Sequence, residues 1–339
     1  MIKDATPLID ALRDPQSVSA LGDGQWSELI SIARAESLIG SLAHRLRGLD
    51  LPDRVQAIFD DAIDSHELVR TQALWEADCS RRALLYVEGK TVLMKGTAYV
   101  AAGLAAGVGR SIGDLDILVG KDKLTLVEEA LLDAGWEWVK PDPYDDQYYR
   151  EHMHELPPMI HRERDQMIDV HHTILPLTAK PMPDPQKMLE DAVELADGLF
   201  IMAPADMTCH CVAHVMADGD FAGGLRNLWD FHGLVTEFSA HNVQFWQQLE
   251  QRAQRHQLLQ HVRWAAVLSH QLYGTAIPEQ WSVGSKIRDR LTLHRLTARD
   301  GYGRETRKLT RLIFYIRSHW LRMPPMMLAK HLWTKFRRP

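Results

Sequence analysis

The chain has 339 residues, of which 45% are hydrophobic and 25% are charged. This composition excludes a disordered or fibrous chain, and the length predicts two or three domains. The formal net charge of −6 argues against a globally basic nucleic-acid binder. Three cysteines, Cys79, Cys209 and Cys211, are too few for a disulfide scaffold and suit a reducing compartment, so we expect a cytoplasmic protein.

Neither a secretory leader nor a membrane span is expected. The opening segment MIKDATPLIDALRDP has acidic residues where a leader needs an apolar core. The most prominent uncharged stretch, residues 97–109, is thirteen residues long. It is shorter than the roughly 20 apolar residues needed to cross a bilayer.

Residues 1–88 are expected to be helical, with amphipathic runs that begin near Trp26 and after Pro52. The pattern then changes to alternating short strands and helices. The predicted elements are a strand at 91–95, an Ala-rich helix at 96–107, a strand at 114–119, a helix at 121–135 and a strand at 136–139.

Residues 141–150 are expected to form a polar, aromatic loop. Two strands follow, within 152–160 and 166–174, joined by the charged turn HRERD. After a Pro-rich loop at 176–185, the chain is predicted to be mostly helical again.

The most distinctive motif is Asp114-Leu115-Asp116 at the start of a predicted strand. Side chains two residues apart on a strand share a face, so the two carboxylates are expected to point the same way. Like charges this close repel, and a bound divalent cation such as Mg²⁺ removes that cost. Asp169, in the strand MIDVHH, brings a third carboxylate to the same place if the two strands are neighbours.

A candidate phosphate site precedes this motif. Gly96 and Thr97 stand where a strand is predicted to turn into a helix, whose free N–H groups favour anions. Lys95 adds a positive charge, and Arg110 adds a planar guanidinium four residues before Asp114.

The histidines near these aspartates are open to two interpretations. His171 shares a predicted face with Asp169, so it either assists proton transfer and substrate binding or only hydrogen-bonds the carboxylates. His154 is a candidate for the rim of the same pocket. The helical segment around Asp230 is expected to pack in the core, with Asp230 or Arg226 as residues that could reach the site.

A transition-metal site at Cys209, His210, Cys211 and His214 is not favoured. On a helix Cys209 and Cys211 lie about 200° apart, so they cannot both face one ion. A buried helix is the preferred interpretation.

The segments VLMKGTAYVAAGL, GRSIGDLDILV and MIDVHHTI together resemble the nucleotidyltransferase superfamily with the DNA polymerase β-like fold. More narrowly, they are similar to an uncharacterised bacterial nucleotidyltransferase family. The resemblance is clear over residues 90–175 and continues less specifically through Asp230.

The resemblance implies an α+β fold, with a small mixed sheet flanked by helical regions. Together with the residue pattern along the chain, it predicts a nucleotidyltransferase core at 89–200 between an N-terminal helical region at 1–88 and a C-terminal helical domain at 201–339. Residues 1–88 and 240–339 carry no motif of the family, and the pattern alone assigns them as helical.

The resemblance also implies a role for each site residue. Asp114, Asp116 and Asp169 would hold Mg²⁺ or Mn²⁺, and Asp169 would help to activate the acceptor as general base. Gly96 and Thr97 would hold the phosphates of an NTP, with ATP expected, and Lys95 and Arg110 would support them.

The expected reaction is transfer of a nucleotidyl group with release of pyrophosphate. The acidic body argues against a long nucleic acid, so the acceptor is expected to be a sugar, small molecule, peptide or protein. The alternative is a catalytically degenerate subunit that binds a nucleotide or a partner, for example in envelope or polysaccharide production.

The charge is unevenly distributed along the chain. From Arg304 to the C-terminus there are ten Lys or Arg and one acid, whereas the preceding 303 residues carry 29 basic and 44 acidic groups. The last segment is also amphipathic, because apolar residues recur at helical spacing between basic ones. A final helix packed on the body is the favoured interpretation; peripheral membrane contact through residues 323–339 at the inner face, or contact with nucleic acid, stays open.

Overall fold

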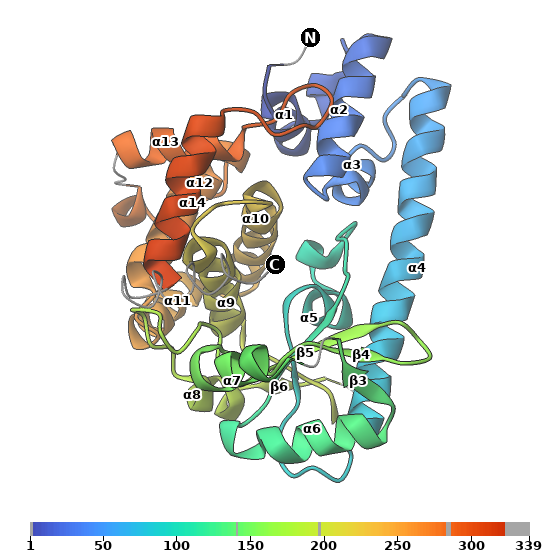
Figure 1. Cartoon of the computed structure of the whole chain (residues 1–339). Coiled ribbons are helices and arrows are strands. Elements are labelled where there is room, and N and C mark those ends of the chain that lie inside the picture. Colours follow the sequence, from blue (N-terminus) through green and yellow to red (C-terminus); the bar gives the residue numbers. More distant parts are fainter. Residues whose placement is uncertain (1–2, 140–141, 196–197, 283–285, 323–339) are drawn as a thin grey trace.

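The computed structural model describes residues 3–139, 142–195, 198–282 and 286–322. Within these residues the chain forms a seven-stranded mixed sheet with helices from both ends of the chain around it (Figure 1). The strand order is β3-β4-β5-β2-β1-β7-β6. The α+β class expected from the sequence, a mixed sheet between helical regions, is therefore confirmed.

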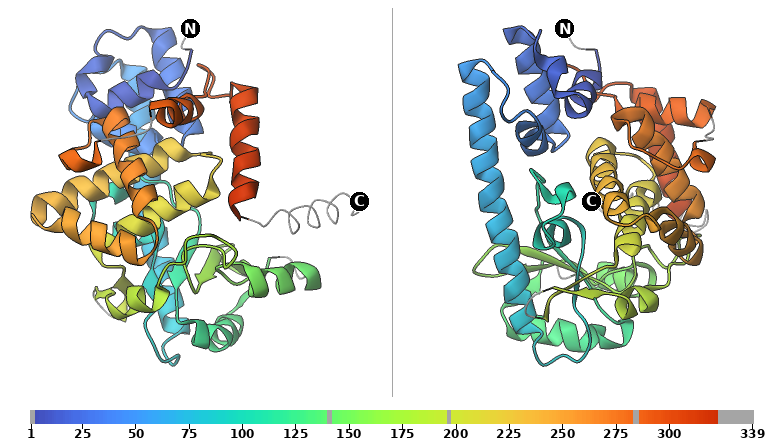
Figure 2. Two further views of the ribbon diagram at one scale, coloured as in Figure 1. Left: turned by 90° about the vertical axis from the view of Figure 1, so that its left-hand side faces the viewer. Right: turned by 180° about the vertical axis from the view of Figure 1, so that it is seen from behind.

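The N-terminal part of the chain is helical, as expected. Its helices are α1 (Thr6–Arg13), α2 (Asp23–Ala35), α3 (Ile39–Arg45) and α4 (Asp53–Ala83). Trp26 of α2 meets Phe59 of α4 edge to face, with ring centroids 6.2 Å apart. The 31-residue helix α4 runs from this cluster down to the sheet along one side of the molecule (Figures 1 and 2).

The centre of the sheet comes from three short strands. β1 (Val92–Leu93) is antiparallel to β2 (Leu115–Leu118), and β2 is parallel to β5 (Met167–His171). Between β1 and β2 the chain forms the short helix α5 (Lys95–Ala101). Val92, Leu93, Ile117 and Leu118 are fully buried, which explains why these short apolar runs become inner strands.

The outer strands are antiparallel. α6 (Leu124–Asp133) leads into β3 (Trp136–Trp138), which pairs with β4 (Met159–His161), and β4 pairs with β5. On the other edge, α8 (Pro185–Glu190) precedes β6 (Val193–Glu194) and β7 (Phe200–Ile201). β7 also runs parallel to β1.

Residues 141–150 were expected to form a loop, but most of them belong to helix α7 (Pro143–His152). Side-chain pairs one helical turn apart support this polar helix, because Arg150 donates to Asp146 at 2.9 Å. Arg150 also reaches Glu128 of α6 at 2.6 Å. This second contact links residues far apart in the sequence, so local patterns did not reveal it.

The C-terminal helices gather on the side of the molecule opposite α4 (Figures 1 and 2). They are α9 (Pro204–Asp218), α10 (Gly224–His241), α11 (Phe245–Arg255), α12 (Leu259–Tyr273), α13 (Lys286–Leu296) and α14 (Lys308–Arg322). Residues 323–339, for which membrane contact was considered, lie outside the described residues. The division into three regions at 88 and 200 stays a prediction.

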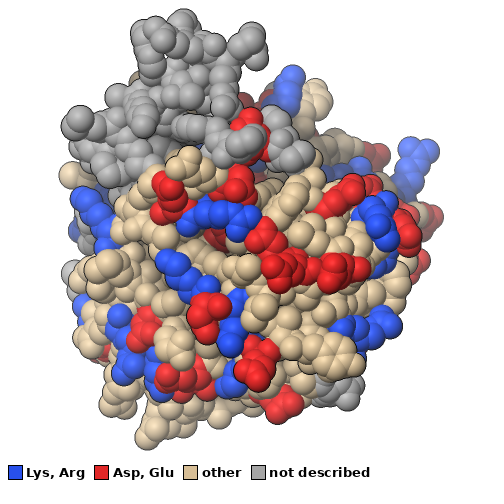
Figure 3. Space-filling model, turned by 60° about the horizontal axis from the view of Figure 1, so that its bottom comes forward, with Lys and Arg blue, Asp and Glu red and all other residues tan. Residues whose placement is uncertain are grey.

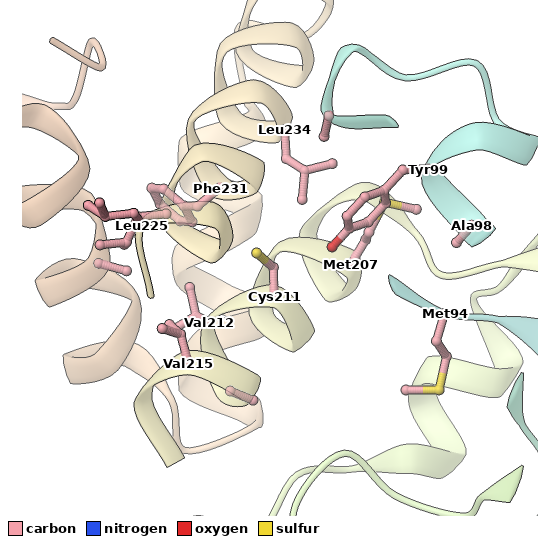
Figure 4. Close-up of a cluster of buried hydrophobic side chains, with 14 of the residues drawn as sticks. Met94, Ala98, Tyr99, Met207, Cys211, Val212, Val215, Leu225, Phe231 and Leu234 are labelled. Atoms are coloured by element: carbon pink, nitrogen blue, oxygen red, sulfur yellow. The ribbon is translucent and has the colours of Figure 1, made fainter. Parts of the chain in front are cut away.

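A buried apolar cluster connects the sheet to these helices. Figure 4 shows Tyr99 of α5 close to Met207 of α9 and Leu234 of α10. All three side chains are almost completely buried. This packing fixes α10 relative to α5, and both helices carry polar residues of the candidate site. Among the described residues no helix is both long and apolar enough to span a membrane.

Candidate active site

The parallel pairing of β2 with β5 brings two carboxylates together. Asp116 of β2 lies directly opposite Asp169 of β5 in the register. The sequence predicted that Asp116 and Asp169 would converge if their two strands were neighbours, and β2 and β5 are indeed paired. Asp116 is only 2% exposed among apolar β2 residues, so its ionised form must be stabilised by specific partners.

Two cationic or polar side chains supply that stabilisation. The Lys95 ammonium lies 2.5 Å from Asp116 Oδ1, and His171 Nε2 lies 2.9 Å from the same oxygen. Burial alone would raise the pKa of Asp116, but the hydrogen bond from His171 and the charge of Lys95 hold it well below its usual value. Asp116 is therefore ionised throughout the neutral pH range.

Lys95 is held in an unusual backbone conformation. Its φ angle of +47° lies in the left-handed region, which costs a non-glycine residue about 1–3 kcal/mol. Burial lowers the pKa of Lys95, yet Asp116 more than offsets this and raises it above the usual value. A charged ammonium is therefore held at the point where β1 passes into α5.

Asp169 differs from Asp116 because no Lys or Arg among the described residues pairs with it directly. Burial and the neighbouring charges of Asp116 and Glu155 raise the pKa of Asp169 to about 7. Two carboxylates in one buried site thus have opposite pKa shifts. This is the arrangement in which one acid stays charged while the other can exchange a proton near neutral pH.

Glu155 joins this cluster from the segment before β4. A β-bridge pairs Glu155 with His171, and His171 Nδ1 lies 3.3 Å from Glu155 Oε2. The His154 ring lies tilted against that of His171 with centroids 5.2 Å apart, and burial lowers the pKa of His154 well below its usual value. His171 therefore hydrogen-bonds Asp116 through Nε2, while its Nδ1 faces Glu155 without a hydrogen bond among the described residues. His154 lies beside it as a neutral ring.

Sequence reasoning did not identify Glu155. The pattern that could have indicated it is the alternation in HMHELPP, in which Glu155 stands two residues from Met153 and next to the candidate residue His154. Only the bridge to His171 places its carboxylate in the cluster, and that bridge joins segments sixteen residues apart.

Asp114 stands next to the cluster, just before β2. β2 begins at Leu115, so Asp114 precedes the strand, and its side chain is exposed. Its charge nevertheless acts on Lys95 and Asp169. Thr97 is buried in α5 and, together with Asp114, lines a small pocket between α4 and β2.

Arg110 is occupied by a structural ion pair. Its Nε donates to Asp230 Oδ2 of α10 at 2.9 Å, and both side chains are buried. Its guanidinium also lies 5.4 Å from the ring centroid of Tyr99. A Cβ atom on Gly96 would come 2.0 Å from Arg110 Nη1, so only glycine leaves room for the arginine here.

Arg226 is a second arginine near the site with few partners. It lies on α10, one helical turn before Asp230, and its Nε is buried without a hydrogen-bond partner among the described residues. Its closest hydrogen bond is from Nη2 to the side chain of Asn227 at 3.5 Å. Burial and the charge of Arg110 lower the pKa of Arg226, while Asp230 and Asp114 act in the opposite direction.

The donor set fits a divalent cation. Ligand atoms of Asp116, Asp169 and His171 all lie within 4.8 Å of one another, as do those of His154, Glu155 and His171. In the described ranges these are the two groups of three that could hold an ion, and neither includes Cys209, His210 or Cys211. The raised pKa of Asp169 shows that its charge is poorly compensated, which a hard cation would correct.

This electrostatic conflict predicts a pH-dependent effect on stability. The pKa of Asp169 is raised from 3.8 to about 7, so the folded state binds a proton that the unfolded state has already released. The resulting stabilisation is present at acidic pH and is lost as the pH rises through about 7. In EDTA, Asp169→Asn should therefore become more stable relative to wild type by ~2 kcal/mol between pH 5 and pH 8.

Urea unfolding of both proteins at several pH values measures this difference. Asp165→Asn is the matched control, because Asp165 is an exposed aspartate on the adjacent turn. A difference between Asp169→Asn and wild type that is constant across this pH range would contradict the predicted electrostatics.

The fold and this cluster define a class of protein. A mixed sheet with two aspartates in register on neighbouring strands, next to a partly buried lysine, is suited to metal-assisted phosphoryl transfer. Residues 22–274 match the family model described as uncharacterised nucleotidyltransferase. The chain belongs to this family, as its sequence motifs indicated. A search among curated proteins found no significant match.

Proposed function

We propose that this protein is a Mg²⁺-dependent enzyme that transfers a nucleoside monophosphate from an NTP to an acceptor hydroxyl. The observation that carries this proposal is the in-register pair Asp116 and Asp169 beside Lys95. The acceptor oxygen forms a bond to the α-phosphorus, the bond from that phosphorus to the bridging oxygen breaks, and pyrophosphate leaves.

Asp116 and Asp169 would hold the metal, and the neighbouring Asp114 would complete the set. Bound Mg²⁺ (or Mn²⁺) supplies positive charge that stabilises the transferred phosphoryl group. Asp169 would also accept the proton of the acceptor hydroxyl, because it is the carboxylate of the pair that no described cation already neutralises. His171 keeps Asp116 ionised and oriented, and His154 borders the same space.

The triphosphate would be held by side chains on α5 and α10. Lys95, Gly96 and Thr97 are proposed to contact the phosphates from the start of α5. Arg110 would act through its ion pair with Asp230, by positioning Gly96 and α5. Unlike Arg110, Arg226 keeps an N–H group that could donate to a phosphate, since its Nε has no partner among the described residues.

Arg226→Gln is expected to weaken binding of an NTP by about tenfold, because one charge-assisted hydrogen bond to phosphate is removed. Titration calorimetry with a non-hydrolysable ATP analogue in the presence of Mg²⁺ measures the affinity. Arg162→Gln is the control, since Arg162 is an exposed arginine on the β4–β5 turn. Equal affinities for wild type and Arg226→Gln would remove Arg226 from the proposed phosphate site.

A small molecule, sugar, peptide or protein is proposed as the acceptor, with ATP as the expected donor. Figure 3 shows acidic and basic side chains interspersed over the lower face of the molecule. This face offers no continuous positive track for a nucleic-acid backbone. The cytoplasmic location expected from the cysteine content stays a prediction.

The direct test is a screen of the four NTPs, labelled at the α-phosphate, with Mg²⁺ or Mn²⁺ and fractionated cell extract. Transfer of label together with release of pyrophosphate is the expected result. Binding of NTP without pyrophosphate release across all fractions would instead support a degenerate, nucleotide-binding subunit. The Lys95 ammonium on Asp116 is the observation in favour of that alternative, because it already neutralises the central carboxylate.

A further inference from the structure

Helix α14 exposes a row of large apolar side chains. These residues recur at helical spacing and are 45–73% exposed: Leu309, Leu312, Ile313 and Ile316. Tyr315 beside them is 53% exposed. Most exposed apolar residues on a protein surface occur singly, so a contiguous row on one helix needs an explanation.

The same helix is anchored to the protein by its other face. Thr310, Phe314 and Ser318, spaced four residues apart, are buried. Phe314 packs edge to face against Phe221, with ring centroids 5.4 Å apart. The row is therefore exposed although α14 is packed on the protein. The helix stands at the outer edge of the molecule in the left view of Figure 2.

The charge around this row is positive. The sequence of α14 contains four Lys or Arg and no acidic residue. The neighbouring helix α13 adds three exposed basic residues, Lys286, Arg288 and Arg290, while its Asp289 and Arg295 are buried. One acid, Glu305, pairs with Arg295 and with Arg311 of α14, so the exposed charge of the two helices stays positive. α13 also exposes two apolar residues one turn apart, Ile287 at 85% and Leu291 at 40%. The rest of the chain has an acidic surplus, so positive charge and exposed apolar area coincide on this part of the fold.

We propose that the outer face of α14 docks on a membrane surface that contains anionic phospholipids. An amphipathic helix with an apolar row and basic flanks buries its apolar side chains at the level of the lipid headgroups while its Lys and Arg attract the negative charge. This contact involves α14 itself and is independent of the proposed nucleotidyl transfer.

The test uses the full chain and co-sedimentation with vesicles of phosphatidylglycerol and phosphatidylethanolamine, or of phosphatidylcholine alone. Wild type should pellet with the anionic vesicles and much less with the neutral ones, and added salt should release it. Leu312→Glu with Ile316→Glu should reduce the partition coefficient by about tenfold or more.

The control is Leu68→Glu with Val243→Glu, which adds the same two negative charges at exposed apolar positions on other surfaces. It should bind vesicles like wild type, and circular dichroism should show native helix content in both variants. Equal loss in both double variants, or wild-type binding by the α14 variant, would overturn the proposal. Equal pelleting of wild type with neutral and anionic vesicles would also overturn it. The same holds if wild type does not bind vesicles and light scattering shows a dimer that the α14 substitutions dissociate.

Discussion

Asp116→Asn is expected to reduce nucleotidyl transfer by about a thousandfold or more, because it removes the charge that holds the metal in the centre of the site. Asp169→Asn should cause a loss of similar size, since it removes both a metal ligand and the proposed base. Pyrophosphate release under saturating NTP measures both variants. The two aspartates face each other in the register, so neither loss should be rescued by the other.

Two controls make this result specific. Asp122→Asn changes an exposed aspartate shortly after β2 and should leave activity unchanged. Asp116→Asn also leaves the Lys95 ammonium without its partner, so its folding must be checked by thermal unfolding. Asp169 has no such partner in the part of the chain that the structure describes, and Asp169→Asn is therefore the cleaner variant. Full activity in Asp169→Asn would remove this aspartate from the catalytic site.

The second large effect concerns stability. Asp230→Leu is expected to lower the free energy of unfolding by about 3–5 kcal/mol, because it leaves the buried guanidinium of Arg110 without its counter-charge. Denaturant unfolding of wild type and variant measures the loss. The effect should exceed that of most surface substitutions several-fold.

The comparison with other variants separates a charge effect from a packing effect. Arg110→Met combined with Asp230→Leu should recover much of the stability, since it removes both charges together. Glu67→Gln breaks an exposed pair with Arg70 and should cost at most about 1 kcal/mol. A double variant as unstable as Asp230→Leu alone would show that packing, and not the uncompensated charge, causes the loss.

The strands that carry the central residues of the site could largely be predicted from local patterns. Period-two alternation places Asp116 on a strand and Asp169 with His171 on one face of another. The structure brings these three residues together. Local patterns also predicted β1, β2, β5 and α6 with small errors at their ends.

Several site features depend on contacts that no local pattern encodes. The charge of Arg110 suggested a phosphate ligand, yet Asp230, 120 residues later, occupies its guanidinium. Arg226 lies on the same helix as Asp230 and keeps donor groups that Arg110 has lost. Glu155 enters the cluster because of a single bridge to His171.

The sequence by itself determined the fold class, the family and the aspartates at the centre of the site, because strand periodicity and motif spacing depend only on neighbours along the chain. Only the tertiary structure decided which charges neutralise one another, how the pKa values of Asp116 and Asp169 diverge, and which face of α14 stays exposed. These properties follow from distance and burial, and both are set by packing between residues far apart in the sequence.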